Sequence, residues 1–173
     1  MGDFLFGRRG TGDSEEAFAH YEESLDLRRE LKRDHPSSAE ATRDVSVSLD
    51  KLGEFLSRRG HYRDAEDALA HFTDSLAIRR DLRESNPVNS EAVRDVSLAL
   101  DKLGDFYLHR TLPGDTPKAG DFYEESLALR RELLSGNPKN GTANRNLSVS
   151  LNKMGVFLLE RWHSGDANLA IDY

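Results

Sequence analysis

The 173-residue sequence contains no cysteine. It therefore has neither disulfide bonds nor thiolate ligands for a structural metal, a composition that fits a reducing compartment. Proline is scarce too, with 5 residues, and no apolar run approaches the roughly 18 residues that a transmembrane helix needs. We therefore expect a soluble, cytoplasmic protein without a membrane partner.

Positive charge is also in the minority, because the formal net charge is -7. Binding to nucleic acids depends on clustered cationic side chains, so we expect no nucleic-acid partner. Apolar residues make up 37% of the chain and charged residues 32%. This mixture is typical of amphipathic helices that surround one continuous core.

What the sequence does contain is a long internal repeat. The segment RDVSVSLDKLGEFL begins at Arg43 and returns as RDVSLALDKLGDFY at Arg94 and, within NRNLSVSLNKMGVFLL, at Arg145. The spacing is constant, since 94 minus 43 and 145 minus 94 both equal 51. A fixed period of this length indicates stacked units, each unable to bury its apolar face alone. We expect a single solenoid domain over 1–173, with repeats at about 2–52, 53–103 and 104–154 and a partial repeat at 155–173.

Each repeat should contain two helices. Val45, Leu49, Leu52 and Leu56 fall at helical spacing, which predicts a first helix over about 38–59, with counterparts over 91–110 and 142–162. A second apolar stripe follows Gly60 and predicts another helix that ends before residues 86–87, with counterparts over 13–34 and 117–135. A short polar residue precedes each first helix as a predicted N-cap, namely Ser38, Asn89 and Asn140.

One turn is expected to differ from the others. Residues 111–116, TLPGDT, are rich in residues that break helices. They predict a longer, protruding turn with Thr116 as the N-cap and Pro117 at the first helical position.

The repeated pattern resembles the tetratricopeptide repeat. Leu52, Gly53 and Leu56 match its first helix, and Ala68 and Phe72 match its second, which a proline follows at 87. The segments FTDSLAIRRDLRESNP and YEESLALRRELLSGNP are similar to the kinesin-light-chain-like subgroup. The resemblance implies an all-α fold, a right-handed α–α superhelix of antiparallel helix pairs. The 51-residue unit is longer than the usual repeat of roughly 34 residues, so we expect longer helices.

The resemblance also implies a function, which is protein–protein interaction. It places a concave groove, where a peptide or protein partner would bind, along one face of the first helices. The chain would then be a non-enzymatic scaffold and a fragment of a larger regulatory protein. The apolar positions on that face are Val47, Leu98, Val149 and Val156, and the predicted polar groove residues are Asp50, Lys51, Glu54, Arg58, Asp101, Lys102, Asp105, His109, Asn152 and Lys153.

Two interpretations of these polar rows stay open. Alternating signs suit the charged side chains and backbone amides of an extended peptide, but an ordinary solvated face has the same pattern. A second hypothesis is self-assembly into dimers or head-to-tail oligomers, because the chain stops within a repeat at both ends. The residues expected to stack are Phe4, Phe18 and Tyr21 at one end and Phe157, Leu158 and Trp162 at the other.

The repeated arginines and serines predict structural roles. Antiparallel packing around the turn near residues 36–37 sets Arg29 opposite Asp44, with the counterpart pairs Arg80–Asp95 and Arg131–Asn146. The repeated serines (Ser46, Ser97 and Ser148) are expected to be small packing residues rather than nucleophiles, since no histidine and aspartate recur with them. The six histidines share neither a repeat position nor a metal-ligand spacing, so we expect no catalytic, metal or cofactor site.

Overall fold

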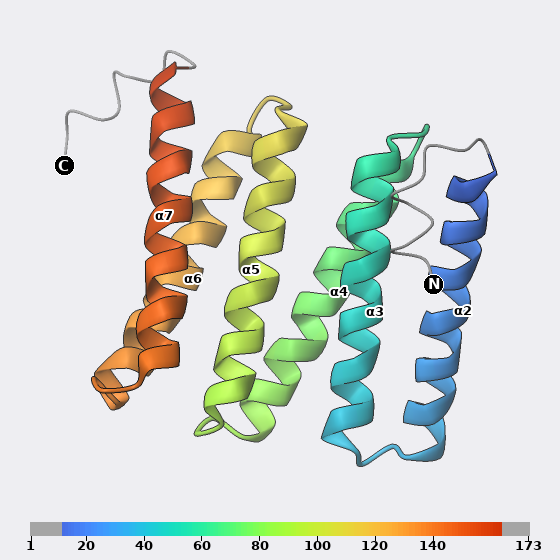
Figure 1. Cartoon of the computed structure of the whole chain (residues 1–173), viewed down its shortest axis with the longest axis horizontal. Coiled ribbons are helices and arrows are strands. Elements are labelled where there is room, and N and C mark those ends of the chain that lie inside the picture. Colours follow the sequence, from blue (N-terminus) through green and yellow to red (C-terminus); the bar gives the residue numbers. More distant parts are fainter. Residues whose placement is uncertain (1–11, 164–173) are drawn as a thin grey trace. The chain divides into compact units, whose positions relative to one another are not determined.

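The computed structural model describes residues 12–163, and within this range it contains six α-helices and no strand. The fold class is the predicted one, an all-α, tetratricopeptide-like helical solenoid built from antiparallel helix pairs (Figure 1). The helices are α2 (Asp13–Asp34), α3 (Ala39–Arg59), α4 (Asp64–Ser85), α5 (Ser90–Arg110), α6 (Asp115–Gly136) and α7 (Gly141–His163).

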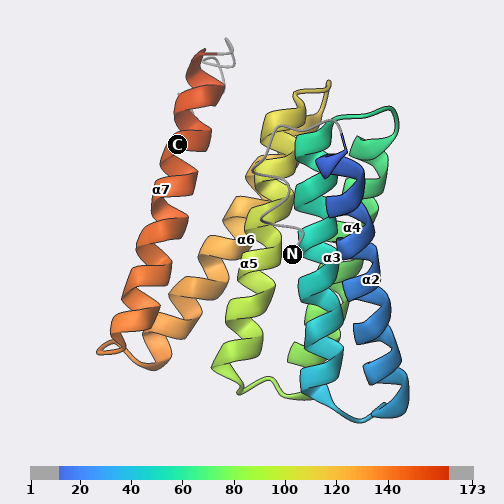
Figure 2. The same ribbon diagram turned by 45° about the vertical axis from the view of Figure 1, so that its right-hand side comes forward.

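The chain divides into two compact units, Met1–Asn86 and Pro87–Tyr173. In the first unit, α3 packs against both α2 and α4. In the second, α6 packs against both α5 and α7, and α6 and α7 diverge from the turn that joins them (Figure 2). The single solenoid domain with its repeat boundaries stays a prediction.

The first helix of each pair begins where the sequence predicts. The Ser38 hydroxyl accepts a hydrogen bond from the Ala41 backbone N–H at 3.1 Å. The side chains of Asn89 and Asn140 each accept from two backbone N–H groups at the start of α5 and α7. All three residues therefore satisfy donors that a helix N-terminus leaves without partners, and the predicted caps are confirmed.

The turn before α6 differs from the prediction. The helix begins at Asp115, one residue before the predicted N-cap Thr116, and Gly114 is the N-cap. Residues 111 and 114, at the two ends of the turn, have left-handed φ angles of 55° and 85°, against 69° and 73° at residues 60 and 63. The two turns therefore have the same length and the same backbone shape, and the proline and glycine do not lengthen the second one.

Each helix pair closes on a glycine. A Cβ atom at Gly53 of α3 would lie 2.7 Å from the ring of Phe72 on α4, and one at Gly104 of α5 would lie 2.5 Å from the ring of Tyr123 on α6. Both distances are too short for a real contact, so only glycine lets the two backbones approach this closely. The apolar core of the first unit continues through Leu25 and residues of α3.

Candidate protein-interaction surface

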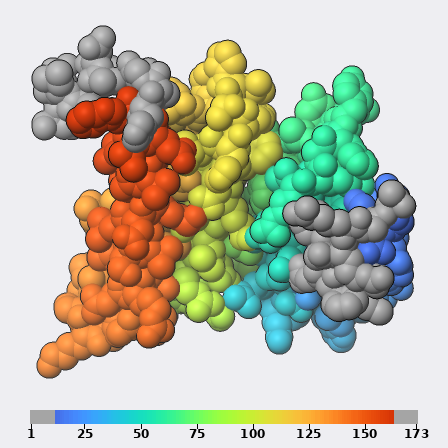
Figure 3. Space-filling view, turned by 45° about the horizontal axis from the view of Figure 1, so that its top comes forward, coloured from blue at the N-terminus to red at the C-terminus, as the bar shows by residue number. Residues whose placement is uncertain are grey.

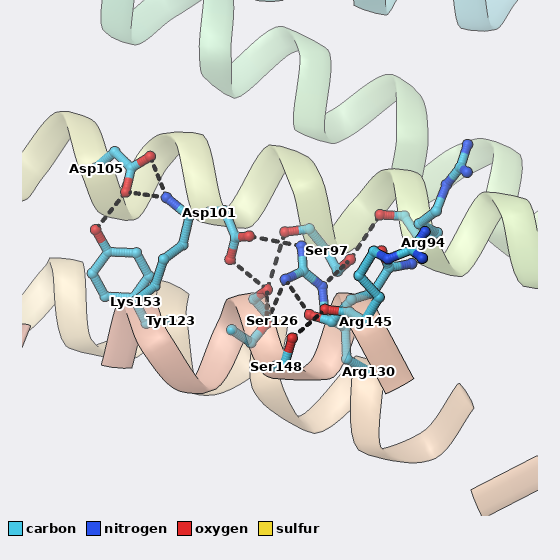
Figure 4. Close-up of polar contacts among 12 residues, drawn as sticks. Arg94, Ser97, Asp101, Asp105, Tyr123, Ser126, Arg130, Arg145, Ser148 and Lys153 are labelled. Atoms are coloured by element: carbon cyan, nitrogen blue, oxygen red, sulfur yellow. Dashed lines mark hydrogen bonds and ion pairs between the residues drawn. The ribbon is translucent and has the colours of Figure 1, made fainter. Parts of the chain in front are cut away.

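A buried arginine, Arg130, holds the three helices of the second unit together (Figure 4). It lies on α6 and donates from Nη2 to Oδ2 of Asp101 at 2.7 Å and from Nε to the Ser97 hydroxyl at 3.0 Å, both on α5. Its Nη1 donates to α7, reaching the Asn146 carbonyl at 3.0 Å and the Ser150 hydroxyl at 2.6 Å. One guanidinium therefore links α5, α6 and α7.

The carboxylate of Asp101 has a second donor. The Ser126 hydroxyl donates to its Oδ1 at 2.6 Å. Burial raises the pKa of Asp101, while the hydrogen bond from Ser126 and the charge of Arg130 oppose that rise. Because a buried charge is tolerated when it is paired and hydrogen-bonded, this cluster is a structural element.

The first unit contains the same arrangement. Arg79 of α4 donates from Nη2 to Oδ2 of Asp50 at 2.7 Å and from Nε to the Ser46 hydroxyl at 3.1 Å. Asp50 and Asp101, which were predicted to face a partner, are therefore buried at 4% exposure each. They lie on the side of the first helix that faces the second helix, so that prediction is wrong for these two residues.

The repeated serines do more than provide a small side chain for close packing. Ser46 and Ser97 are fully buried, and each hydroxyl accepts from an arginine Nε while donating to a backbone carbonyl of its own helix. The predicted structural role is confirmed for these two, but they act as hydrogen-bonding partners of the arginine. Ser148 makes the same bond to its own helix but is exposed.

Two of the three predicted arginine pairs are shifted by one residue. Arg28, not Arg29, reaches α3, and its Nη1 donates to the backbone carbonyl of Asp44 at 3.0 Å. Arg29 is exposed, and its Nη1 lies 3.4 Å from Oδ1 of Asp26 on its own helix. Likewise Arg130 contacts Asn146 while its neighbour, Arg131, is exposed. One residue turns the side chain by about 100° around a helix, so the predicted register was close but selected the wrong side.

A second repeated ion pair closes each turn. Arg110, the last residue of α5, binds Asp115 of α6 through two bonds, Nε to Oδ2 at 2.8 Å and Nη2 to Oδ1 at 2.6 Å. Asp115 also accepts from the backbone N–H of Leu112 at 3.0 Å. The hydrogen bond from Arg110 lowers the pKa of Asp115, and the same bond raises the pKa of Arg110.

Arg59 and Asp64 form the same pair in the first unit, with Nε donating to Oδ2 at 2.9 Å and Nη2 donating to Oδ1 at 2.7 Å. The hydrogen bond from Arg59 likewise lowers the pKa of Asp64. Sequence reasoning missed both aspartates. The signal was present as an Arg-x4-Asp spacing that recurs after 51 residues.

The structure brings together two of the predicted groove residues, Asp105 of α5 and Lys153 of α7. Nζ of Lys153 lies 2.6 Å from both carboxylate oxygens, and the Tyr123 hydroxyl donates to Oδ1 at 2.7 Å. Burial and this hydrogen bond raise the pKa of Tyr123. Asp105 and Lys153 are half-buried, so the pair joins α5 to α7 and still meets solvent.

The other predicted residues occupy surface positions on the first helices. Lys51, Arg58, His109 and Asn152 are exposed, and two more are half-buried, Glu54 and Lys102. Nδ1 of His109 lies 2.6 Å from the backbone carbonyl of Asp105.

Exposed apolar side chains lie on the same two helices as the Asp105–Lys153 pair. Leu98 of α5 is 40% exposed, and Val149 and Val156 of α7 are 43% and 52% exposed. Helical spacing places them on the same faces of α5 and α7 as the ion pair. Figure 3 shows α7 as an orange-to-red ridge beside α5. We define the α5–α7 surface by Leu98, Lys102, Asp105, His109, Val149, Lys153 and Val156.

Residues 9–37 match a family model described as tetratricopeptide repeat. This match supports membership of the tetratricopeptide repeat family. The chain is also 30% identical over 141 residues to Protein NCA1 of Arabidopsis thaliana. The match covers 82% of this chain and 33% of that protein, so the chain spans about a third of the length of this relative.

Tetratricopeptide repeats generally mediate protein–protein interaction and are typically non-enzymatic. Within residues 12–163, no group of three or more His, Cys, Asp or Glu side chains could hold a metal ion. None of the helices in the described part of the chain is long and apolar enough to span a membrane.

Proposed function

We propose that the chain is a protein-interaction module that binds a protein or peptide partner on the α5–α7 surface. The observation that supports this most directly is the exposure of Leu98, Val149 and Val156 on the helix faces that carry a half-buried ion pair. Exposed apolar side chains that gather on one face are a feature of binding sites, because partner contact removes them from water.

The chemistry of this surface suggests the kind of partner. Three aliphatic side chains offer apolar contact, and Asp105 and Lys153 offer one charge of each sign. A helix or an extended segment with apolar anchors flanked by acidic and basic groups would complement them. On α3 of the first unit, Val47, Lys51, Glu54 and Arg58 form a similar row, which we propose as a further contact surface.

The finer predictions also belong to this proposal. The 51-residue unit is supported by contacts that recur at that spacing, Arg79–Asp50 and Arg130–Asp101. Membership of the kinesin-light-chain-like subgroup rests on the resemblance of the segments FTDSLAIRRDLRESNP and YEESLALRRELLSGNP. A cytoplasmic location is supported by the absence of cysteine. The net charge of -7 favours a protein partner over nucleic acid or an acidic membrane.

The test is capture of partners by the immobilised chain, followed by affinity measurement with each purified partner. The test variant replaces Leu98, Val149 and Val156 by lysine. Because it removes the apolar contact and adds charge, we expect the dissociation constant to rise at least tenfold, about 1.4 kcal/mol. A second variant, with Lys51, Lys102 and Lys153 replaced by glutamate, should also weaken binding.

A matched control introduces the same three lysines on the exposed face of α6, at Asp121, Glu124 and Ala128. It should bind partners as the unmodified chain does. Equal loss with the control and the test variant would refute the α5–α7 surface, as would full binding by the test variant.

A further inference from the structure

A groove lies between α2 and α4 in the first unit. Both helices pack on α3, and the groove between them has a volume of about 670 Å³ and is open to solvent rather than enclosed. Val45 and Leu49 of α3 line it and are buried, at 5% and 2% exposure. They lie about 200° around α3 from Val47 and Lys51, because each residue turns a helix by about 100°. The groove is therefore separate from the contact surface proposed on α3.

Each wall of this α2–α4 groove is one stripe of a helix. Residues 29, 32, 33 and 36 line it from α2 and the turn that follows, and residues 74, 77, 78 and 81 line it from α4. Both sets have the spacing i, i+3, i+4 and i+7, which gathers side chains on one helix face over two turns. At a rise of about 1.5 Å per residue, each wall is about 10 Å long.

The two walls carry opposite charges. The α2 wall contains Arg29, Lys32 and Arg33, whereas the α4 wall contains Asp74 and Asp81. Lys32 is half-buried and the other four side chains are exposed. Arg29 and Arg33 each contact a carboxylate of their own helix, at 3.4 and 3.6 Å. Within residues 12–163, no ion pair connects one wall to the other. The opposite charges therefore face a ligand rather than each other.

The part of the α4 wall between the aspartates is apolar. Ala77 is exposed and Ile78 is half-buried, where it packs against the core of the first unit. Ile78 offers apolar contact, and the small side chain of Ala77 allows a ligand backbone to approach. A complementary ligand is therefore apolar in the middle, acidic along one edge and basic along the other.

Of the two common peptide conformations, only a helix combines these three stripes over two turns. In an extended chain successive side chains alternate between two opposite faces, so an apolar centre leaves no room for two differently charged edges. A helix distributes its side chains around the whole axis, and helices pack against stripes of this spacing by placing ridges into grooves. The geometry thus favours a helix over an extended segment.

We propose that the α2–α4 groove binds an amphipathic helix of a partner protein. Its apolar stripe faces Ile78, its acidic edge meets the α2 wall, and its basic edge meets the α4 wall. The charges also fix the direction of the bound helix, because turning it end for end places each edge on the wrong wall. This site goes beyond the proposed function, since it lies in the other unit and takes a different ligand.

A second copy of this chain is a poorer occupant. Two chains that each carry a formal net charge of -7 repel one another. The aromatic residues expected to stack in self-assembly also have contacts within the chain. Phe157 is buried, and Phe18 and Tyr21 pack on Phe55 at 5.9 and 5.5 Å between ring centroids. Phe4 lies outside the described residues, and self-assembly stays a prediction.

Three model peptides test the charge pattern on the unmodified chain. Each is about 18 residues long, because shorter helices are marginal in water, and each has a leucine stripe. The first has glutamate on one edge and lysine on the other, the second has glutamate on both edges, and the third has lysine on both. Fluorescence anisotropy should show the mixed peptide binding about tenfold more tightly than the other two. Equal binding of all three, tightest binding of the lysine peptide, or no binding would overturn the proposal.

Reversing one wall tests the assignment of the edges. The double variant Asp74→Lys, Asp81→Lys makes both walls basic, so its preference should change to the peptide with glutamate on both edges. This gain also shows that the variant is folded. The matched control, Asp121→Lys with Glu124→Lys on the exposed face of α6, changes the net charge equally and should still prefer the mixed peptide. The same change of preference in both variants would show that only net charge matters and would refute the site.

Methyl NMR locates the bound peptide and separates the two proposals. The mixed peptide should shift the methyl signals of Ile78 and leave those of Leu98 and Val156 unchanged. The variant with lysine at Leu98, Val149 and Val156 should bind the mixed peptide as the unmodified chain does, so failure of one proposal leaves the other intact. Shifts at Val156 without a shift at Ile78 would refute the α2–α4 groove as the binding site.

Discussion

At the scale of single residues, the buried arginines show how a polar group can stabilise a helix pair. Taking a guanidinium and a carboxylate out of water is costly, and only good geometry with further hydrogen bonds offsets that cost. Arg130 has such partners on two neighbouring helices. Lysine has no planar array of donors and could not reproduce these contacts.

Replacing Arg130 by methionine should therefore be severe. The change leaves the Asp101 carboxylate buried without its cation, and losing one member of a buried pair costs about 3–5 kcal/mol. Urea denaturation should show this loss in the free energy of unfolding, and the double variant Arg130→Met, Asp101→Asn should recover part of it. A single variant within 1 kcal/mol of the unmodified chain would contradict the structural role.

The repeated glycines give an internally controlled prediction. Gly104→Ala inserts a methyl group 2.5 Å from the Tyr123 ring, so we expect a loss of about 1–3 kcal/mol. Gly155→Ala, at the same repeat position, meets nothing within 4 Å and should gain roughly 0.5–1 kcal/mol, because alanine restricts the unfolded chain and favours the helix. Thermal unfolding at low protein concentration measures both changes, and a stabilising Gly104→Ala would refute the close approach of α5 and α6.

At the scale of helices and turns, the Arg110–Asp115 and Arg59–Asp64 pairs connect the end of one helix to the start of the next. Each carboxylate also lies at a helix N-terminus, where the helix dipole favours negative charge. Both interactions stabilise the ionised carboxylate, in agreement with the lowered pKa of Asp64 and Asp115.

The pH dependence of stability follows from these lowered pKa values. A lowered folded-state pKa contributes stability that is present above the unfolded pKa, about 4, and is lost as pH falls through the folded value. We therefore expect the free energy of unfolding to decrease below about pH 4, and to decrease less steeply in Asp115→Asn. Asp101, whose pKa is raised, contributes with the opposite sign. Denaturation at several pH values measures the slopes, and equal slopes would exclude Asp115 as a contributor.

Much at this scale was predictable from the sequence. Apolar spacing located the helices, and Ser38, Asn89 and Asn140 were identified as caps because N-capping depends on a few neighbouring residues. The turn at residues 111–114 was misjudged, because its composition suggested irregularity while its backbone angles depend on the contact of Asp115 with Arg110.

At the scale of the whole molecule, the candidate site was predicted less well. Asp50 and Asp105 both lie on first helices with similar sequence surroundings, yet Asp50 is buried by Arg79 and Asp105 remains half-exposed. What separates them is the neighbouring helix, whose position the periodicity of one helix does not encode.

The central claim is that partners bind through the apolar residues of the α5–α7 surface, while the buried arginine network only supports it. Methyl NMR of the unmodified chain, titrated with a captured partner, tests this most directly. We predict that the methyl signals of Leu98, Val149 and Val156 shift on binding, while those of Ala128 on α6 do not. Shifts confined to α6, with Leu98, Val149 and Val156 unchanged, would contradict the account.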